Sequence, residues 1–367
     1  MGALMSRYLA VLGRQTEISL AELEAVFGGV KQISRDLAVF DSASLPEIAR
    51  LGGSLKLAVK LSEAPLGYLS KIESGKITIG VSDYTDKASK KTAATEALKL
   101  KKILVRHGRS VRVVENKDAM LSTATSLHNG LSGKNPRKVE LIKTDDGWYR
   151  VIGVQDIDAY ARRDQARPAR DAKVGMLPPK LAQILINLCG GLPEGSVVLD
   201  PFCGTGVVLQ EALLMGYFAY GTDISERMIE YSDKNLKHFD FKNYKLEVGD
   251  ATNHQWKEPI GVVACEGYLG KPFSKIPIEM ELKEQKQECK SIMLGFLKNL
   301  AGQIEAGTPV VVAMPAWFRE NGEYERLEIL DLIGELGYNV NNKSREGLLY
   351  CREGQIVARD IIILRKK

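Results

Sequence analysis

The stretch Ser196-Val197-Val198-Leu199-Asp200-Pro201-Phe202-Cys203-Gly204-Thr205-Gly206 decides the fold of this chain. A short apolar run ends at an acid, a turn with two glycines follows, and the next apolar segment, residues 207–215, is predicted to be a helix. This strand–loop–helix order is typical of nucleotide-binding α/β domains. Gly204 and Gly206 allow a ligand to approach the backbone where a Cβ would collide. We expect Asp200 at the carboxyl end of the strand, facing the crevice where such folds hold ligands.

A second acid follows at the distance expected for a ribose-binding carboxylate. Residues 217–223 form a predicted strand that ends at Asp223, about twenty residues after the glycine turn. A packing or capping role for Asp223 is the alternative. The third glycine of a dinucleotide-binding loop is missing, and the chain lacks the Lys-Ser/Thr pair of a P-loop. These absences disfavour dinucleotides and ATP, and we expect S-adenosylmethionine as the ligand.

Strands and helices alternate after this stretch, which predicts a doubly wound parallel sheet. The chain ends differently, because residues 348–351 and 356–364 form a predicted hairpin whose last strand runs antiparallel. A parallel sheet closed by a hairpin distinguishes class I methyltransferases from dehydrogenases. The predicted strands cover residues 196–200, 217–223, 244–249, 260–265 and 308–314, and the predicted helices cover residues 207–215, 226–236, 279–304 and 325–336.

The ends of the third and fourth strands carry further polar residues. Asp250, with Ala251 beside it, is a candidate for binding an adenine amino group, and a plain turn residue is the alternative. Methylation of an exocyclic amine needs an acceptor for the hydrogen of the nitrogen and a flat wall that holds the base. The fourth strand end supplies Glu266 as the acceptor and Tyr268 as the wall.

The first part of the chain is basic. Residues 1–170 hold 28 Lys and Arg against 19 Asp and Glu, whereas the remainder holds 23 against 27. Such asymmetry suggests a polyanionic partner, although a solvated charged surface explains it equally well. Eight basic residues fall between Lys87 and Arg109, in a predicted helix without interleaved aromatic residues, which favours phosphate contacts over base stacking. The candidate RNA contacts are Lys90, Lys91, Lys101, Lys102, Arg106, Arg109, Arg163 and Arg167.

Composition argues against a disordered, a membrane-spanning, a disulfide-rich or a metal-binding protein. The 44% hydrophobic and 26% charged residues are ordinary for a globular protein. No apolar run approaches the roughly 18 residues that cross a membrane. The five cysteines lack CxxC spacing and the four histidines lack ligand spacing, so we expect no disulfide framework and no metal site, and we expect a reducing, cytoplasmic location.

Four segments resemble one known family, the THUMP-domain RNA methyltransferases that modify the N2 of a guanosine at position ten of tRNA. They are RDQARPARDAKVGMLPPKLAQILINL (163–188), DPFCGTG (200–206), GTDIS (221–225) and YCREGQIVARDIIIL (350–364). The resemblance implies a ferredoxin-like domain at 1–70, a THUMP RNA-binding domain at 71–157, a linker at 158–178 and a Rossmann-like class I methyltransferase domain at 179–367. It also implies tRNA or another structured RNA as partner, and some members require a small activating subunit. The residues that it assigns to S-adenosylmethionine are Asp200, Pro201, Phe202, Cys203, Gly204, Thr205, Gly206, Asp223, Ile224, Asp250 and Ala251.

The fourth strand departs from the family pattern. Cys265-Glu266-Gly267-Tyr268 stands where the family has Asp-Pro-Pro-Tyr. Aligning on the acid assigns Glu266 to the Asp position and keeps Gly270 in register, which we prefer, whereas aligning on the ring assigns Cys265 there. Three functions follow: a tRNA guanine-N2 methyltransferase, an RNA-binding protein that keeps the fold without the chemistry, and a DNA amino-methyltransferase.

Overall fold

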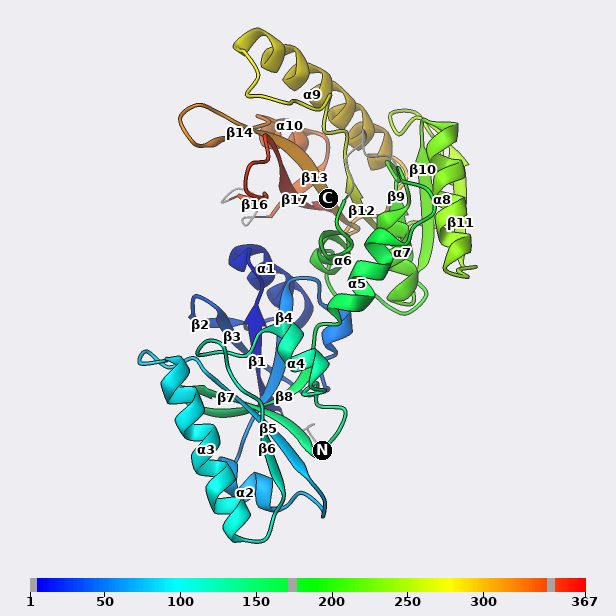
Figure 1. The fold of residues 1–367 in the computed structure, drawn as a ribbon. Helices are drawn as coiled ribbons and strands as arrows, with labels where there is room; N and C mark the ends of the chain where they lie inside the picture. The colour runs from blue at the N-terminus through cyan, green and yellow to red at the C-terminus, as the bar shows by residue number, and fades with distance from the viewer. Residues whose placement is uncertain (1–4, 171–176, 342–346) are drawn as a thin grey trace. The chain divides into compact units, whose positions relative to one another are not determined.

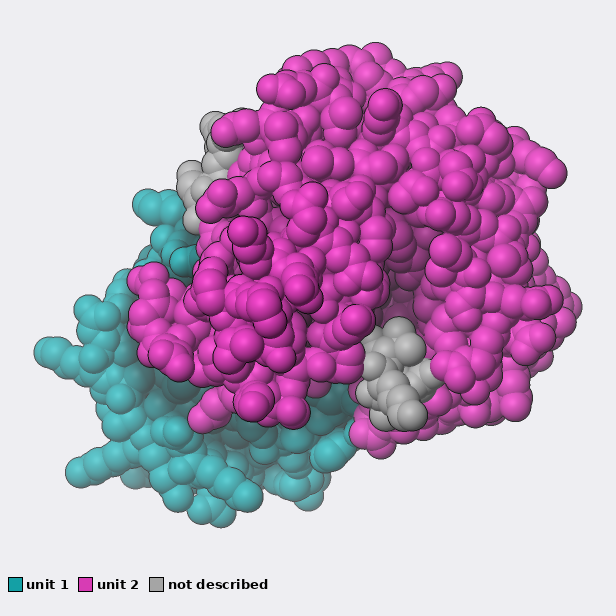
Figure 2. Space-filling model, turned by 90° about the horizontal axis from the view of Figure 1, so that it is seen from above, with its two compact units in different colours: residues 1–159 teal, residues 160–367 magenta. Residues whose placement is uncertain are grey.

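The computed structural model describes residues 5–170, 177–341 and 347–367. The chain divides into two compact units, Met1–Ala159 (unit 1) and Tyr160–Lys367 (unit 2), which Figure 2 colours separately. Each unit is built around one β-sheet with helices packed against it (Figure 1).

Unit 1 is an eight-stranded mixed sheet in the order β2-β3-β1-β4-β8-β7-β5-β6. Its strands β7 and β8 pair antiparallel and form a hairpin that turns at Asp145 and Asp146. The elements are β1 (Ser6–Leu12), α1 (Thr16–Phe27), β2 (Lys31–Ser34), β3 (Leu37–Ser42), the 3₁₀ turn η1 (Ile48–Arg50), β4 (Ser54–Lys60), α2 (Pro65–Ser70), β5 (Ile77–Asp83), α3 (Lys90–Arg106), β6 (Val111–Val113), α4 (Thr123–His128), β7 (Lys138–Thr144) and β8 (Gly147–Val154).

The two domains predicted for the first part of the chain share this single sheet. β4 lies in residues 1–70 and β8 lies in residues 71–157, and the two strands pair antiparallel from Lys56↔Val154 to Lys60↔Tyr149. The ladder of backbone hydrogen bonds therefore runs across the predicted boundary. Assigning the two halves to ferredoxin-like and THUMP domains stays a prediction.

Helix α3 shows how a very basic segment packs on this sheet. Its buried residues are Ala93, Ala97, Leu100 and Leu104, which repeat every three or four positions and form one apolar stripe. Ser89 and Thr92 form a capping box at its start. The lysines and arginines are thereby left on the opposite, solvent-facing side.

Unit 2 is a nine-stranded sheet whose main path is β11-β10-β9-β12-β13-β17-β15, with β14 paired to β13 and β16 paired to β17. The first five strands of this path are parallel, and β17 is antiparallel to β13, as the terminal hairpin predicted. The elements are α5 (Ile157–Gln165), which begins in unit 1, and α6 (Pro179–Leu188), β9 (Val197–Asp200), α7 (Val207–Leu214), β10 (Phe218–Asp223), α8 (Glu226–His238), β11 (Tyr244–Val248), β12 (Val262–Glu266), α9 (Glu279–Ala301), β13 (Pro309–Phe318), β14 (Tyr324–Arg326), α10 (Leu330–Glu335), β15 (Tyr338–Val340), β16 (Leu348–Tyr350) and β17 (Val357–Lys366).

Strand order creates a switch point beside β9. The chain runs outward from β9 through β10 to β11 and then returns to the other side of β9 as β12. The connections on either side of β9 and β12 therefore diverge and leave a crevice at the carboxyl ends of these strands, where ligands of open α/β sheets bind.

The long helix α9 covers one face of this sheet. Its buried Met293, Phe296 and Leu297 pack in one cluster with strand residues such as Val312. Side chains alternate between the two faces along a strand, so the neighbours of these strand residues point to the face away from α9, where α6 packs against β12 and β13. This division into two faces determines which side chains can meet at the strand ends.

The predicted linker is partly helical. Its first residues belong to α5, and α6 begins at Pro179, just after its end. Residues 171–176 of the linker lie outside the described residues.

Candidate active site

The glycine loop after β9 is held by its own backbone and by α8. Gly204 and Gly206 adopt positive φ values of 50° and 82°, in the left-handed region that glycine tolerates best. The amide of Gly206 donates to the carbonyl of Cys203 (2.7 Å), and Ser232 Oγ on α8 donates to the carbonyl of Gly204 (2.8 Å). A Cβ on Gly206 would approach Ser232 Oγ to 2.9 Å, whereas a Cβ on Gly204 would meet only the carbonyl oxygen of Phe202, at 3.9 Å. The loop is therefore closed toward α8 and open above Gly204.

The other loop residues predicted to bind the cofactor are mostly buried supports. The Cys203 amide donates to the carbonyl of Thr222 (2.9 Å), and the Cys203 thiol lies 3.8 Å from Ser232 Oγ. Phe202 packs edge-on against Phe296 of α9, with ring centroids 5.2 Å apart. Pro201 and Thr205 are also buried. These side chains hold the loop, and its exposed backbone is left to face a ligand.

Asp223 ties the ends of two strands together. Its Oδ2 accepts a hydrogen bond from the amide of Gly204 (2.9 Å), and its Oδ1 accepts one from the amide of Ser225 (2.9 Å). Asp223 thus fixes the glycine loop and the turn before α8. Each carboxylate oxygen can accept a second hydrogen bond, so the same side chain can still receive ribose hydroxyls.

Three neighbouring strands end in an acid at the switch point: β9 at Asp200, β10 at Asp223 and β12 at Glu266. Asp200 is 2% exposed, and its burial raises its pKa well above the usual range; Asp223 and Glu266 raise it further, against the amide of Phe202 that donates to it. Burial also raises the pKa of Asp223. A site that concentrates acids in this way favours a cationic ligand.

The end of β11 contributes a turn and exposed apolar side chains. Asp250 Oδ1 accepts hydrogen bonds from the amide (2.9 Å) and hydroxyl (2.8 Å) of Thr252, and Ala251 is buried against α9. Ile224 is 72% exposed and Val248, which pairs with Asp223, is 51% exposed. Val248 was not predicted from the sequence, although an apolar residue at a strand end beside a proposed nucleoside site was a signal for it.

Glu266 is bound by an arginine that the sequence did not single out. Nε of Arg359, on β17, donates to Oε1 of Glu266 at the end of β12. Burial raises the pKa of Glu266, and the charge of Arg359 opposes this effect. Arg359 lies within the quoted terminal segment, but no local pattern connects it with a residue 93 positions earlier.

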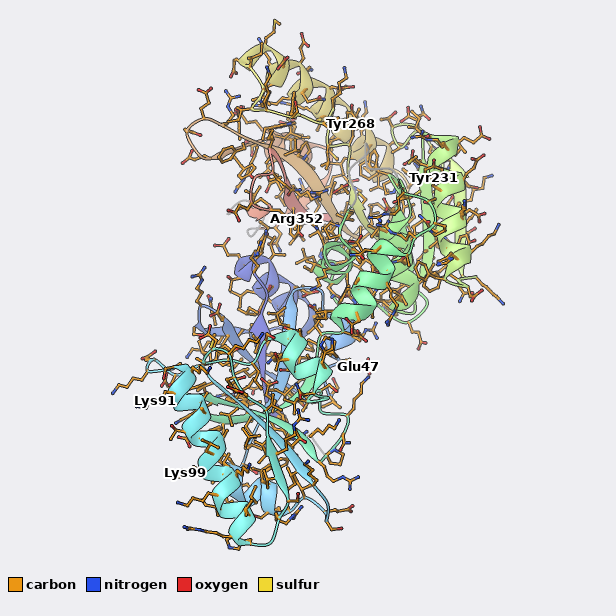
Figure 3. All side chains as sticks on the ribbon, viewed as in Figure 1. Glu47, Lys91, Lys99, Tyr231, Tyr268 and Arg352 are labelled. Atoms are coloured by element: carbon orange, nitrogen blue, oxygen red, sulfur yellow. The ribbon has the colours of Figure 1, made fainter. Side chains whose placement is uncertain are left out.

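Tyr268 is not brought together with Glu266. Its ring packs beneath α9, next to the core cluster, and its hydroxyl lies near Gln285 and Glu288 of that helix (Figure 3). Burial raises the pKa of the phenol, and the charge of Glu288 adds to this. The side chain of Glu266 lies on the other face of the sheet, because its neighbour Cys265 belongs to the cluster under α9.

The basic residues predicted to contact RNA fall into two groups. Lys90, Lys91, Lys102 and Arg106 are exposed on α3, as is Lys99, and Lys101 is half-buried; Figure 3 shows Lys91 and Lys99 extending from the helix. None of the five exposed side chains has an ion-pair partner within the ranges that the structure describes.

Arg109, Arg163 and Arg167 have partners within the protein, and their contacts with RNA stay a prediction. Arg109 donates to the carbonyls of Ile72 and Glu73 (2.8 Å each), so it fixes a loop. Arg163 forms a two-pronged ion pair with the buried Glu211 (2.8 and 3.2 Å). The 3%-exposed Arg167 donates to Thr205 Oγ1 (3.1 Å) and so braces the glycine loop. These three side chains thus differ from the exposed basic residues of α3, which have no such partners in the described ranges.

The described residues lack two kinds of feature, a membrane-spanning helix and a metal-binding cluster. None of their helices is long and apolar enough to cross a membrane. The same residues contain no group of three or more His, Cys, Asp and Glu side chains that could hold a metal ion.

Comparison with known families bears on unit 2. A family model described as a methyltransferase domain matches residues 192–307. Together with the strand order, this match decides the assignment. Unit 2 has the class I methyltransferase fold. A second model, described as a DNA methylase, matches residues 115–234.

Three curated relatives share one name, tRNA (guanine(10)-N2)-dimethyltransferase. The protein of Methanothermobacter thermautotrophicus is 37% identical over 154 residues, 41% of this chain and 43% of that protein. The protein of Pyrococcus abyssi is 41% identical over 100 residues, 27% of this chain and 26% of that protein. The protein of Methanocaldococcus jannaschii is 27% identical over 255 residues, 64% of this chain and 72% of that protein. The match thus spans less than half the length of the first two relatives.

Two solved structures resemble the chain along nearly all of its length. TrmN from Thermus thermophilus is 18% identical with a TM-score of 0.48, over 99% of this chain and 100% of that one. A possible methylase from Clostridium difficile 630 is 14% identical with a TM-score of 0.46, over 99% and 98%. Likeness at this level adds no support of its own, and the fold assignment rests on the strand order and the domain match.

Proposed function

We propose that this protein transfers a methyl group from S-adenosylmethionine to the exocyclic N2 of a guanosine in tRNA. The observation that carries the proposal is that Asp200, Asp223 and Glu266 end β9, β10 and β12 at the switch point of a methyltransferase fold. The names of the curated relatives supply the substrate and the acceptor atom.

The residues at the strand ends fit S-adenosylmethionine. The cofactor carries a sulfonium and an ammonium group, and the buried acids Asp200 and Asp223 suit a cation better than the phosphates of a dinucleotide. The space above Gly204, which a side chain would fill, suits the amino-acid part. Asp223 would accept hydrogen bonds from the ribose, and Ile224 and Val248 would cover the apolar faces of the adenine.

Glu266 would act on the acceptor. When bound, S-adenosylmethionine supplies an electrophilic methyl group. The guanine amine is a poor nucleophile because its lone pair is delocalised into the ring. A carboxylate that accepts a hydrogen bond from the N–H would orient this amine and increase its electron density.

Helix α3 would bind the phosphate backbone of the RNA. Its exposed lysines and Arg106 line one side of a helix without acidic partners, which suits the phosphates of a folded RNA. The cytoplasm remains the compartment that we propose, because all five cysteines are free thiols.

The test is methyl transfer by the full chain alone to unmodified tRNA. With tritiated S-adenosylmethionine we expect label in N2-methylated guanosine, and nucleoside mass spectrometry distinguishes one methyl group from two. Glu266→Gln should reduce the rate about 100-fold or more while cofactor binding is retained. If tRNA is labelled when this chain is the only protein present, no activating subunit is required. Folded protein that binds the cofactor but labels no tRNA would rule the proposal out.

An RNA-binding protein without catalysis is the second candidate. The ion pair of Glu266 with Arg359 and the turn of Tyr268 toward α9 favour it, since both side chains have partners within the protein. If this candidate is correct, the wild type and Glu266→Gln should bind tRNA with equal affinity, and neither protein should transfer label to it.

A DNA amino-methyltransferase is the third candidate, favoured by the DNA-methylase match over residues 115–234. Binding measured across a salt titration separates it from the first, because a DNA enzyme should prefer duplex DNA to tRNA at every salt concentration.

A further inference from the structure

The ion pair between Arg359 and Glu266 is the feature of unit 2 that the proposed chemistry leaves unexplained. Both side chains are largely buried, with 6% of the arginine and 16% of the glutamate side chain exposed. Only Oε1 of the glutamate is used by this pair. Among the residues that the structure describes, Oε2 of Glu266 accepts no hydrogen bond.

Strand register explains how the two residues meet across β13. Glu266 of β12 lies opposite Ala313, and Arg359 of β17 lies opposite Pro315, on either side of the same strand. Ala313 and Pro315 are two residues apart, so all four side chains are on one face of the sheet, away from α9. Because these two residues are short, the guanidinium group can cross β13 to reach the carboxylate.

Arg359 supplies the positive charge that balances the buried carboxylate of Glu266. The ionisable groups that act on Glu266 or are influenced by it are Arg359 from β17, Asp200 from β9 and the thiol of its neighbour Cys265. Arg359 is the cation in this set, and Asp200 is a second acid. A buried carboxylate beside another acid would be neutral without a cation.

We propose that Arg359 is a positioning residue for methyl transfer: it fixes the carboxylate of Glu266 through Oε1, so that Oε2 accepts the hydrogen bond from the amine of the acceptor. This inference rests on the proposed function. It assigns to the terminal strand of the sheet a role in the reaction, and it explains why a glutamate works without the stiff proline loop of the family. The arginine holds the carboxylate where the prolines are absent.

Substitutions of Arg359 should change the pH dependence of the rate. In Arg359→Gln, burial acts on Glu266 without an opposing charge, so its pKa rises and the acid side of the pH–rate profile moves to higher pH. In Arg359→Lys the charge is kept but the planar fork is lost, so the shift should be smaller. Arg365→Gln is the matched control, since Arg365 is an exposed arginine on the same strand whose Nη1 donates to the carbonyl of Gly307 (2.8 Å).

The experiment measures single-turnover methyl transfer to tRNA from pH 5 to 9 for the full chain and these three variants. We expect the acid limb of Arg359→Gln to move up by about one pH unit or more, a loss of about tenfold at the acid end that is largely recovered at high pH. Arg359→Lys should shift less, and Arg365→Gln should match the wild type. Thermal unfolding and binding of S-adenosylhomocysteine, measured for each variant, separate this effect from misfolding.

The possible outcomes are distinct. An unchanged profile, or a loss that is equal at every pH, overturns the role of Arg359 while an active wild type still supports the proposed function. An inactive wild type overturns both. If Arg359→Gln does not fold, Arg359→Lys decides, because its acid limb must still move upward. A readout independent of catalysis is ¹³C NMR of labelled glutamate, in which the Glu266 resonance, identified with Glu266→Gln, should titrate at higher pH in either Arg359 variant.

Discussion

Asp223 connects the two strand ends on which the proposed cofactor site depends. Its carboxylate accepts hydrogen bonds from the amides of Gly204 and Ser225. In Asp223→Asn one of these amides would face an NH₂ group, and the negative charge would be lost. We expect S-adenosylhomocysteine to bind at least 10-fold more weakly, a loss of about 1.4 kcal/mol or more, measured by isothermal titration calorimetry. The control is Asp240→Asn, because Asp240 has a φ of 57° that asparagine also adopts readily. Equal affinity of wild type and Asp223→Asn would contradict the assignment.

Asp360 should make unit 2 less stable as the pH rises. This aspartate on β17 is 5% exposed, and its Oδ1 accepts no hydrogen bond in the described part of the chain. Burial raises its pKa to about 6, against the charge of Arg326 3.8 Å away. The folded state therefore binds more protons than the unfolded state between about pH 4 and pH 6, and stability falls as the pH rises through this window.

Asp360→Asn should remove this pH dependence. At pH 7 the variant should be more stable than the wild type by on the order of 2–3 kcal/mol, since one pKa unit corresponds to about 1.4 kcal/mol. Urea unfolding at pH 4.5, 6 and 7.5, followed for unit 2, measures the difference. Curves for the two proteins that stay parallel across this range would show that Asp360 does not titrate as described.

At the scale of elements, local patterns predicted long segments well and short ones poorly. The helix at residues 226–236 and the terminal hairpin were predicted correctly, because an apolar helix face and two apolar runs around a short polar turn each fix their own structure. Residues 325–336 were expected to be one helix, but β14 pairs with the extended end of β13 and only α10 is helical. Pairing with the preceding strand overrode local helix propensity there.

In the candidate site, too, the residues placed by local sequence could be predicted, and those placed by the pairing of distant segments could not. Asp200 and Asp223 could be predicted to approach each other, because parallel strands bring their carboxyl ends to one edge. The partner of Glu266 could not be predicted, since Arg359 reaches it only through the register of β17 on β13. Nor could sequence alone separate the basic residues exposed on α3 from Arg163 and Arg167, whose acceptors, Glu211 and Thr205, follow from the packing of α5 and the segment after it.

The exposed lysines of helix α3 lead to a prediction on how tRNA binding depends on salt concentration. Replacing Lys90, Lys91 and Lys102 by glutamine should weaken tRNA binding and reduce the slope of log K against log salt by about 2 to 3, since each phosphate contact contributes about 0.7–0.9. The stripe that packs on the sheet is untouched, so unfolding should be unchanged. The control replaces Lys237, Lys283 and Lys298, three exposed lysines of unit 2. Filter binding from 50 to 300 mM salt tests both proteins, and equal slopes would remove α3 from the proposed RNA interface.

At the scale of the whole molecule, a buried ion pair joins the two halves of unit 1. Nζ of Lys56 on β4 donates to Glu140 Oε1 on β7 (2.5 Å), to Ser126 Oγ on α4 (2.8 Å) and to the carbonyl of Leu121 (2.8 Å). The two charged side chains are 2% and 0% exposed. Ser82 Oγ donates to the same carboxylate oxygen (2.7 Å). Residues 1–70 therefore supply the cation, and residues 71–157 supply its acceptors.

Unit 1 should consequently unfold as one body. Lys56→Met leaves Glu140 buried without its cation, which should cost about 3–5 kcal/mol. Because β4 pairs with β8 in one sheet, amide protection should fall in β1–β4 and in β5–β8 alike, while unit 2 keeps its protection. Lys60→Met is the control, since Lys60 is 34% exposed and its pair with Asp146 should contribute less than about 1 kcal/mol. Hydrogen exchange followed by mass spectrometry measures both halves in one experiment. Loss of protection confined to one half would mean that residues 1–70 and 71–157 are independent domains despite the shared sheet.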